Sequence, residues 1–340
     1  MDSPRVDNRT DFEVHPQLYL DVDGEVLLVV VKASFVLGPG FQPEFASAEQ
    51  SRPVRAADEP WGEPTVDSIR YPSDICGNKP GTDVIVVATA HAPNGVAVPT
   101  FDCYARVGPV RKALRIFGLR VWESRGAGIG PSRPIQTLDI RYDFAWGGAD
   151  DSEPDRFVEE PRNPVGRGVA ARAERLTDQL APQIENPDEP IRSASTRPAP
   201  AGFGALGRSA RPRRDIQGTY DAHWQEWRAP LPPRDRPPEA HQAASPGMVA
   251  TPPLVGGEEC ALLNLHPDGP LSFSLPVVRL EVGFTVPGRP NEVFQPALDT
   301  VLIDTWAVGP DKPAILELVW RATTRAPRRL GDATVTVREL

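Results

Sequence analysis

Asp139 and Asp143 are the two carboxylates whose spacing would suit paired acid–base catalysis. They lie in a stretch, residues 136–144, where polar and apolar residues alternate as in a half-buried β-strand, so both side chains share one face. Arg141 lies between them on that face. Catalytic carboxylates need surroundings that push their pKa values apart, whereas an intervening arginine favours a ladder of surface ion pairs. We therefore predict such a ladder here and no catalytic pair.

The histidines and cysteines offer no local site either. The five histidines never fall within four residues of one another, so none forms a local pair of metal ligands. The three cysteines, Cys76, Cys103 and Cys260, lack zinc-finger spacing and are typical of free thiols in a reducing compartment. Cys76 could serve as a nucleophile, but no histidine is evidently placed to orient it.

Common catalytic fingerprints are also missing. The chain has no G-x-S-x-G elbow, no Walker loop, no Rossmann glycine fingerprint after a strand, no H-E-x-x-H and no EF-hand loop. We therefore assign no catalytic residue and expect neither a metal nor an organic cofactor. The alternative is a hydrolase or carbohydrate-active β-sandwich enzyme whose site is assembled from distant loops.

Three aromatic residues form the one concentrated feature that suits binding. Tyr220, Trp224 and Trp227 fall within eight residues, between two proline-rich flanks. Large, stiff and amphipathic side chains of this kind anchor protein interfaces. They can equally pin a loop onto its own sheet, so both interpretations stay open. On the first interpretation these three residues bind a protein partner.

The chain divides by composition into three parts. Residues 150–253 hold seventeen of the forty prolines but only eleven valine, leucine and isoleucine residues, so they cannot bury a core of their own. We predict that this insert, with one short helix over residues 168–180, is laid over a scaffold or orders on binding. An N-terminal β half, residues 1–149, and a C-terminal β half, residues 254–340, should complete a single core.

Short strand patterns separated by turn signals predict an all-β protein with an antiparallel sandwich or barrel-like core. In the strand expected at residues 315–324, Leu316, Leu318 and Trp320 should face that core, packed against the strand at 29–35, while Glu317 and Arg321 face outward. Further strands are expected at 27–37, 84–90, 96–107, 110–117, 120–123, 136–144, 260–265, 271–286, 293–298, 301–308 and 334–337.

Charge and hydropathy limit the classes of partner and the cellular locations that suit this chain. The formal net charge of −9 argues against binding to a phosphate backbone, and the arginines between positions 208 and 214 suit a solvated loop. The N-terminal residues lack the apolar core of a signal peptide, and no apolar run is long enough to span a membrane. The sequence thus favours a soluble, cytoplasmic protein without nucleic-acid or membrane partners.

Ten motifs follow one another along the chain: VVVKASF, PSDICGNKPGTDVIV, APNG, GPVRKALRIFGLRVW, FAWGG, NPVGRG, PQIENP, PAGFG, GTYDAHWQEWRAPLPPRD and LVGGEE. In this order they resemble a bacterial family known as domain of unknown function 2169. The resemblance covers roughly residues 8–276, and its specificity comes from the collinear order of the motifs. Near residues 203–208, where family members usually carry a bulkier residue, this chain reads GALGR, so the insert can have its own specificity.

The resemblance implies a role in type VI secretion. Members of the family look like adaptors or chaperones that help load an effector, often one with a PAAR-type tip, onto the VgrG spike. No catalytic residues are known for the family, so none is carried over. A structural component that remains in the assembled spike is a further alternative.

Overall fold

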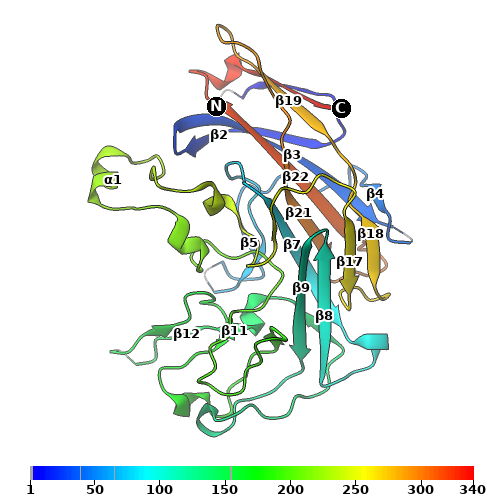
Figure 1. Cartoon of the computed structure of the whole chain (residues 1–340), viewed down its shortest axis with the longest axis vertical. Helices are drawn as coiled ribbons and strands as arrows, with labels where there is room; N and C mark the ends of the chain where they lie inside the picture. Colours follow the sequence, from blue (N-terminus) through cyan, green and yellow to red (C-terminus); the bar gives the residue numbers. More distant parts are fainter. Residues whose placement is uncertain (1–2, 39, 65, 154) are drawn as a thin grey trace.

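The computed structural model describes residues 3–38, 40–64, 66–153 and 155–340. Over these residues the chain is mainly β, as predicted, and the described strands form three large sheets and three short two-stranded ribbons. Figure 1 shows the long strands β3, β21 and β22 crossing the centre of the molecule, with β8, β9, β17 and β18 beside them.

The largest sheet has eight strands and draws on both halves of the chain. β7 and β21 run parallel and the other neighbours run antiparallel. Its main path is β10 (Thr137–Asp139), β7 (Thr82–His91), β21 (Leu298–Thr305), β22 (Ala314–Arg325), β3 (Gly24–Leu37) and β2 (Glu13–Asp21), with β16 (Val249–Ala250) on β7 and β4 (Pro43–Phe45) on β3.

The other sheets are smaller. One has five strands, β15 (Ile184–Glu185), β9 (Val110–Phe117), β8 (Thr100–Val107), β17 (Glu259–Leu263) and β18 (Leu271–Ser274). Another has four strands, β1 (Arg5–Asn8), β23 (Thr334–Glu339), β19 (Leu280–Thr285) and β20 (Glu292–Phe294). The ribbons pair β5 (Glu59–Pro60) with β6 (Ile69–Tyr71), β11 (Trp146–Gly147) with β14 (Arg167–Gly168), and β12 (Ala149–Asp150) with β13 (Val158–Glu159).

One hydrophobic cluster lies between these three large sheets. It includes Val31 and Leu318 from the eight-stranded sheet, Leu114 and Leu262 from the five-stranded sheet, and Val282 from the four-stranded sheet. In the register between β3 and β22, Leu316 pairs with Phe35, Leu318 with Ala33, and Trp320 with Val31. Strands from both sides of the insert therefore share one sheet and one cluster, while the boundaries after residues 149 and 253 stay predictions.

The insert consists mostly of loops and short ribbons packed against the sheets. Its one α-helix among the described residues is α1 (Ala222–Trp227), on a loop that stands out to the side of the molecule in Figure 1. Single turns of 3₁₀ helix occur along the whole chain, at Pro93–Gly95, Ser124–Gly126, Tyr142–Phe144, Ala173–Leu176, Arg213–Ile216, Pro238–His241 and Leu330–Asp332.

The helix predicted over residues 168–180 is wrong. Only Ala173–Leu176 is helical, as a 3₁₀ turn. The neighbouring backbone bonds to another segment instead, because Trp122 N–H donates to Gln179 O and Ala181 N–H donates to Arg120 O. The apolar spacing was real in part, since Leu176 is buried beside Trp122, but long-range pairing prevailed over helix formation.

The strand predicted over residues 136–144 is shorter than expected. β10 ends at Asp139, and Tyr142–Phe144 form a 3₁₀ turn. Ile140 and Tyr142 are nevertheless buried in the main cluster, so the apolar pattern marked the burial and not the backbone conformation.

Two other strand predictions also fail. Residues 120–123 make only isolated bridges, from Val121 to Leu180 and from Trp122 to Ile129. The strand expected over 271–286 is divided between β18 and β19, which belong to different sheets.

Candidate partner-binding loop

The loop of residues 218–236 carries the three aromatic residues assigned to partner binding. Asp235 closes its base, because one carboxylate oxygen accepts a hydrogen bond from Thr219 N (3.1 Å) and the other from Thr219 Oγ1 (2.7 Å). Gly218 has φ +90°, and a Cβ there would lie 2.9 Å from Cβ of Pro233. A glycine thus allows the two ends of the loop to meet.

Helix α1 is short but well capped. The carboxylate of Asp221 accepts a hydrogen bond from Trp224 N at 2.8 Å, which satisfies one of the free amides at the helix start. Trp224 Nε1 donates to Leu231 O (2.9 Å), and its ring packs edge-on against Tyr220 with 4.6 Å between centroids. Trp224 is half-buried, and both of these side-chain contacts brace its own loop.

The other two aromatic residues are open to solvent. Trp227 is 71% exposed and Tyr220 is 53% exposed. A hollow of about 420 Å³ lies beside Trp227, and its lining includes Trp224 and Trp227. The structure therefore places all three residues on one projecting loop, with Trp227 the most accessible.

Arg228 connects this loop to the body of the protein. Its Nη2 donates to the carbonyl oxygen of Val22, in the turn between β2 and β3, and its Nε donates to Pro232 O at 3.0 Å. The contacts of Asp235 with Thr219 therefore hold the two ends of the loop together, and Arg228 binds the loop to the turn after β2. The side chain of Trp227 remains exposed to solvent.

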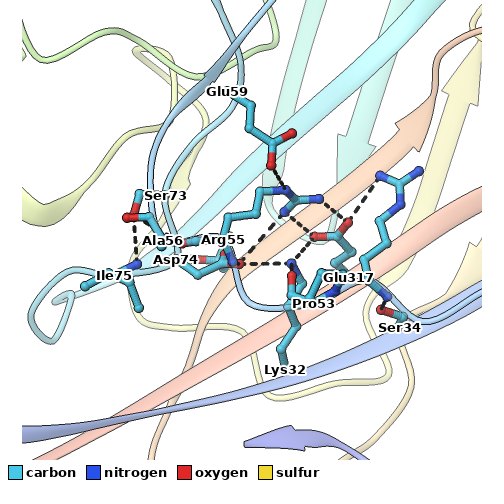
Figure 2. A network of polar contacts seen from close by, with 12 residues as sticks. Lys32, Ser34, Pro53, Arg55, Ala56, Glu59, Ser73, Asp74, Ile75 and Glu317 are labelled. Carbon is cyan, nitrogen blue, oxygen red and sulfur yellow. Dashed lines mark hydrogen bonds and ion pairs between the residues drawn. The ribbon is translucent and has the colours of Figure 1, made fainter. Parts of the chain in front are cut away.

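A buried ionic network lies on the opposite face of β3 and β22 from the main core (Figure 2). Lys32 Nζ lies 2.9 Å from carboxylate oxygens of both Asp74 and Glu317, and Arg55 reaches Glu317 at 2.6 Å. Arg52 pairs with Asp304 at 2.7 Å. The segment between β4 and β7 crosses this face and supplies both arginines and Asp74, so the network fastens that segment to the sheet.

Charge compensation within the network is strong enough to outweigh burial. Burial alone would raise the pKa of Glu317, but the positive charges of Lys32 and Arg55 hold it below the usual range of a glutamate. Burial would also lower the pKa of Arg55, yet Glu317 raises it. Glu317 and Arg55 therefore both stay ionised at neutral pH.

This network corrects the prediction that Glu317 and Arg321 face outward. Glu317 is 0% exposed, and Arg321 is buried in an ion pair with Asp299. Sequence reasoning missed the network because alternation cannot tell a solvated face from a covered one. The available signal was Lys32, the one charged residue in the strand expected at 27–37, which is otherwise apolar on nearly all positions of both faces.

The predicted ladder on the 136–144 stretch forms only in part. Arg141 pairs with Asp143 (2.9 Å) and with Asp67 (2.8 Å). Burial would raise the pKa of Asp143, but hydrogen bonds from Arg141 and Ser68 lower it to about 2. Asp139 instead accepts a hydrogen bond from Thr89 at 2.8 Å, so the carboxylates of Asp139 and Asp143 are held by different partners.

Gly77 and Asn163, two motif residues outside the loop, connect segments within the folded protein. Gly77 N–H donates to Nδ1 of His241 (3.3 Å), and a Cβ at position 77 would lie 2.5 Å from Nε2 of the same ring. Asn163 Nδ2 donates to the carbonyl oxygens of Tyr142 and Trp146, both at 2.9 Å. These residues join segments far apart in the sequence.

A cavity of about 490 Å³ lies between β5–β6 and the insert. Asp58 and Asp67 line it, but Asp58 accepts from Ser73 N (2.7 Å) and Asp67 is paired with Arg141, so neither carboxylate is free of donors. No histidine is among its described lining residues. The geometry thus adds no support to the enzymatic alternative.

Within the described ranges, no group of three or more histidine, cysteine, aspartate or glutamate side chains is arranged to hold a metal ion.

Burial raises the pKa of the Cys260 thiol to about 12 and shifts that of Cys103 upward as well. None of the described helices has the length and apolar character needed to cross a membrane.

Comparison with known proteins gives one match. No curated protein and no solved structure matches this chain. A family described as "Uncharacterized protein conserved in bacteria (DUF2169)" matches residues 23–321, which include every strand from β3 to β21 and the first two thirds of β22. The chain therefore belongs to the DUF2169 family.

Proposed function

We propose that this protein is a non-catalytic adaptor or chaperone, acting in the cytoplasm, that binds a type VI secretion effector and helps load it onto the VgrG/PAAR spike. The observation that carries the proposal is the projecting loop of residues 218–236, which offers Trp227 and Tyr220 to solvent from a fixed base. Interface energy concentrates in large aromatic side chains of this kind. The resemblance of the motif series to secretion adaptors supplies the class of partner.

The loop also suits a carrier that must bind and then release. Its aromatic residues are ordered before binding by the cap at Asp221 and the bond from Trp224 to Leu231, so little entropy is lost when a partner docks. Glu317 is paired with Lys32 and Arg55, so this buried network offers no free catalytic group. Both features favour binding over chemistry.

Replacing Trp227 with alanine should weaken effector binding by about 2 kcal/mol, roughly thirtyfold in Kd, with little change in Tm. The reason is that Trp227 makes its contribution in the complex and is 71% exposed without it. Isothermal titration with the effector that co-purifies with the protein measures Kd, and calorimetry measures Tm.

Phe157→Ala is the matched control, because Phe157 is an exposed aromatic residue (63%) elsewhere in the insert. It should leave Kd unchanged. Unchanged affinity in a well-folded Trp227→Ala protein would remove this loop from the docking surface.

A further inference from the structure

Two tryptophans meet where the β5–β6 ribbon approaches the end of the β21–β22 hairpin. Trp61 follows β5 and Trp306 follows β21, and their rings pack edge-to-face with 5.5 Å between centroids. Both are half-buried and cover an apolar cluster on the outer face of the large sheet that includes Val87 and Leu302. Trp61 and Trp306 therefore form a packed aromatic pair at the surface.

Two cationic side chains, Arg70 and Lys312, contact this aromatic pair through the ring of Trp306. The guanidinium carbon of Arg70, in β6, is 4.8 Å from the ring centroid of Trp306 and 4.9 Å from that of Tyr71. Nζ of Lys312, just before β22, is 3.8 Å from the centroid of Trp306. Both cations therefore contact the same indole, and the positive charge of Arg70 contributes to lowering the pKa of Lys312.

Neither cation has a counterion among the residues that the structure describes. Arg70 and Lys312 take part in no ion pair there, and Nε of Arg70 is buried without a hydrogen-bond partner. Burial lowers the pKa of Lys312, and although Asp304 opposes this, the positive charges of Arg52 and Arg70 add to it. The positive charge at this site is therefore incompletely compensated.

The nearby carboxylates already accept hydrogen bonds or ion pairs from other groups. Asp139, whose charge acts to raise the pKa of Lys312, accepts a hydrogen bond from Thr89 at 2.8 Å. Asp304 accepts from Tyr71 Oη at 2.6 Å and pairs with Arg52 at 2.7 Å. Asp67 and Asp143 pair with Arg141. A carboxylate that joins Arg70 and Lys312 would have to come from outside this group of residues.

We propose that Arg70 and Lys312, held on Trp306, form a binding site for the carboxylate side chains of an acidic segment in a protein partner. Charge complementarity favours this occupant, because a guanidinium and an ammonium that share one support can each donate hydrogen bonds to a carboxylate. The site also contrasts in sign with the formal net charge of the chain, which is −9.

This inference does not depend on the adaptor proposal. Its side chains come from β6 and the β21–β22 hairpin instead of the loop of residues 218–236, and it can be tested with a synthetic peptide. A negative result for one of the two surfaces would therefore not affect the proposal for the other.

The probe is a fluorescein-labelled hexaglutamate peptide, with hexalysine as the counter-probe, measured by fluorescence anisotropy at fixed ionic strength. The wild-type protein should bind hexaglutamate. Lys312→Met should weaken binding by about tenfold, since one charge-assisted contact is lost, and Arg70→Met/Lys312→Met should weaken it further. Methionine retains an apolar chain over the ring, and Lys312 lies in a hairpin end, so the single variant should fold.

Arg208→Met/Arg214→Met is the matched control, because it removes the same charge from exposed positions in the insert. It should leave hexaglutamate affinity nearly unchanged, and Arg70→Glu/Lys312→Glu should shift the preference to hexalysine. The proposal is overturned if the wild-type protein does not bind hexaglutamate, if folded Lys312→Met binds it equally well, or if the control variant loses as much affinity.

Discussion

Replacing Glu317 with glutamine is expected to lower the free energy of unfolding by about 3–5 kcal/mol, because it leaves buried cations without their counterion. Glu317 is fully buried and contacts Lys32 at 2.9 Å and Arg55 at 2.6 Å. A neutral amide can keep some hydrogen bonds but not the charge that keeps these two cations stable inside the protein. Urea unfolding of both proteins at pH 7 gives the difference.

The matched control is Glu281→Gln, which breaks a surface pair with Arg338 at 2.6 Å. Exposed pairs of this kind contribute less than about 1 kcal/mol. If Glu317→Gln costs no more than Glu281→Gln, the network does not hold the segment between β4 and β7 onto the sheet. Because the folded-state pKa of Glu317 is lowered, its contribution is present above the unfolded value of 4.5 and is lost only in stronger acid.

Stability should also fall as the pH drops from 6.5 towards 4, by about 3 kcal/mol, because of His241. Burial, followed by the positive charges of Arg236 and Lys79, lowers the pKa of His241 to about 4 from the ordinary value of 6.5. Between these values the unfolded chain binds more protons than the folded one, so acid favours unfolding. Protonation would also remove the acceptor that Nδ1 offers to Gly77 N–H.

Chemical unfolding at a series of pH values, compared with His241→Gln, isolates this group. Burial lowers the pKa of His91 and His266 as well, so the wild-type slope contains their contributions, but the difference between the two proteins does not. The variant should show the flatter curve. Parallel curves would mean that His241 is accessible to protons in the folded protein.

The strands were predictable because period-two patterns and turn signals are local. Residues 110–117 were predicted as a strand with the bounds that β9 has, and the pattern at 315–324 matches β22 to within one residue. The hydrophobic faces follow for the same reason, as Leu316 and Leu318 show. Burial on one side of a strand leaves a direct record in its sequence.

Features that depend on distant segments were not predictable. The other face of β22 is buried because the segment between β4 and β7 lies over it. The residues adjacent to Glu317 in the sequence do not indicate that this segment covers it. The 168–180 segment has helical spacing, yet it bonds to residues 120–122. The aromatic residues of the candidate loop were found by composition alone, while the brace formed by Trp224 and the accessibility of Trp227 required the structure.

Co-purification tests the central claim most directly. The tagged protein should be isolated from a strain that carries and expresses its native type VI secretion cluster, in parallel with Trp227→Ala and Phe157→Ala, and the bound proteins identified by mass spectrometry. The adaptor account predicts that the wild-type and Phe157→Ala proteins recover a spike protein together with one effector, and that Trp227→Ala loses most of the effector. Recovery of the folded wild-type protein with neither partner would contradict it.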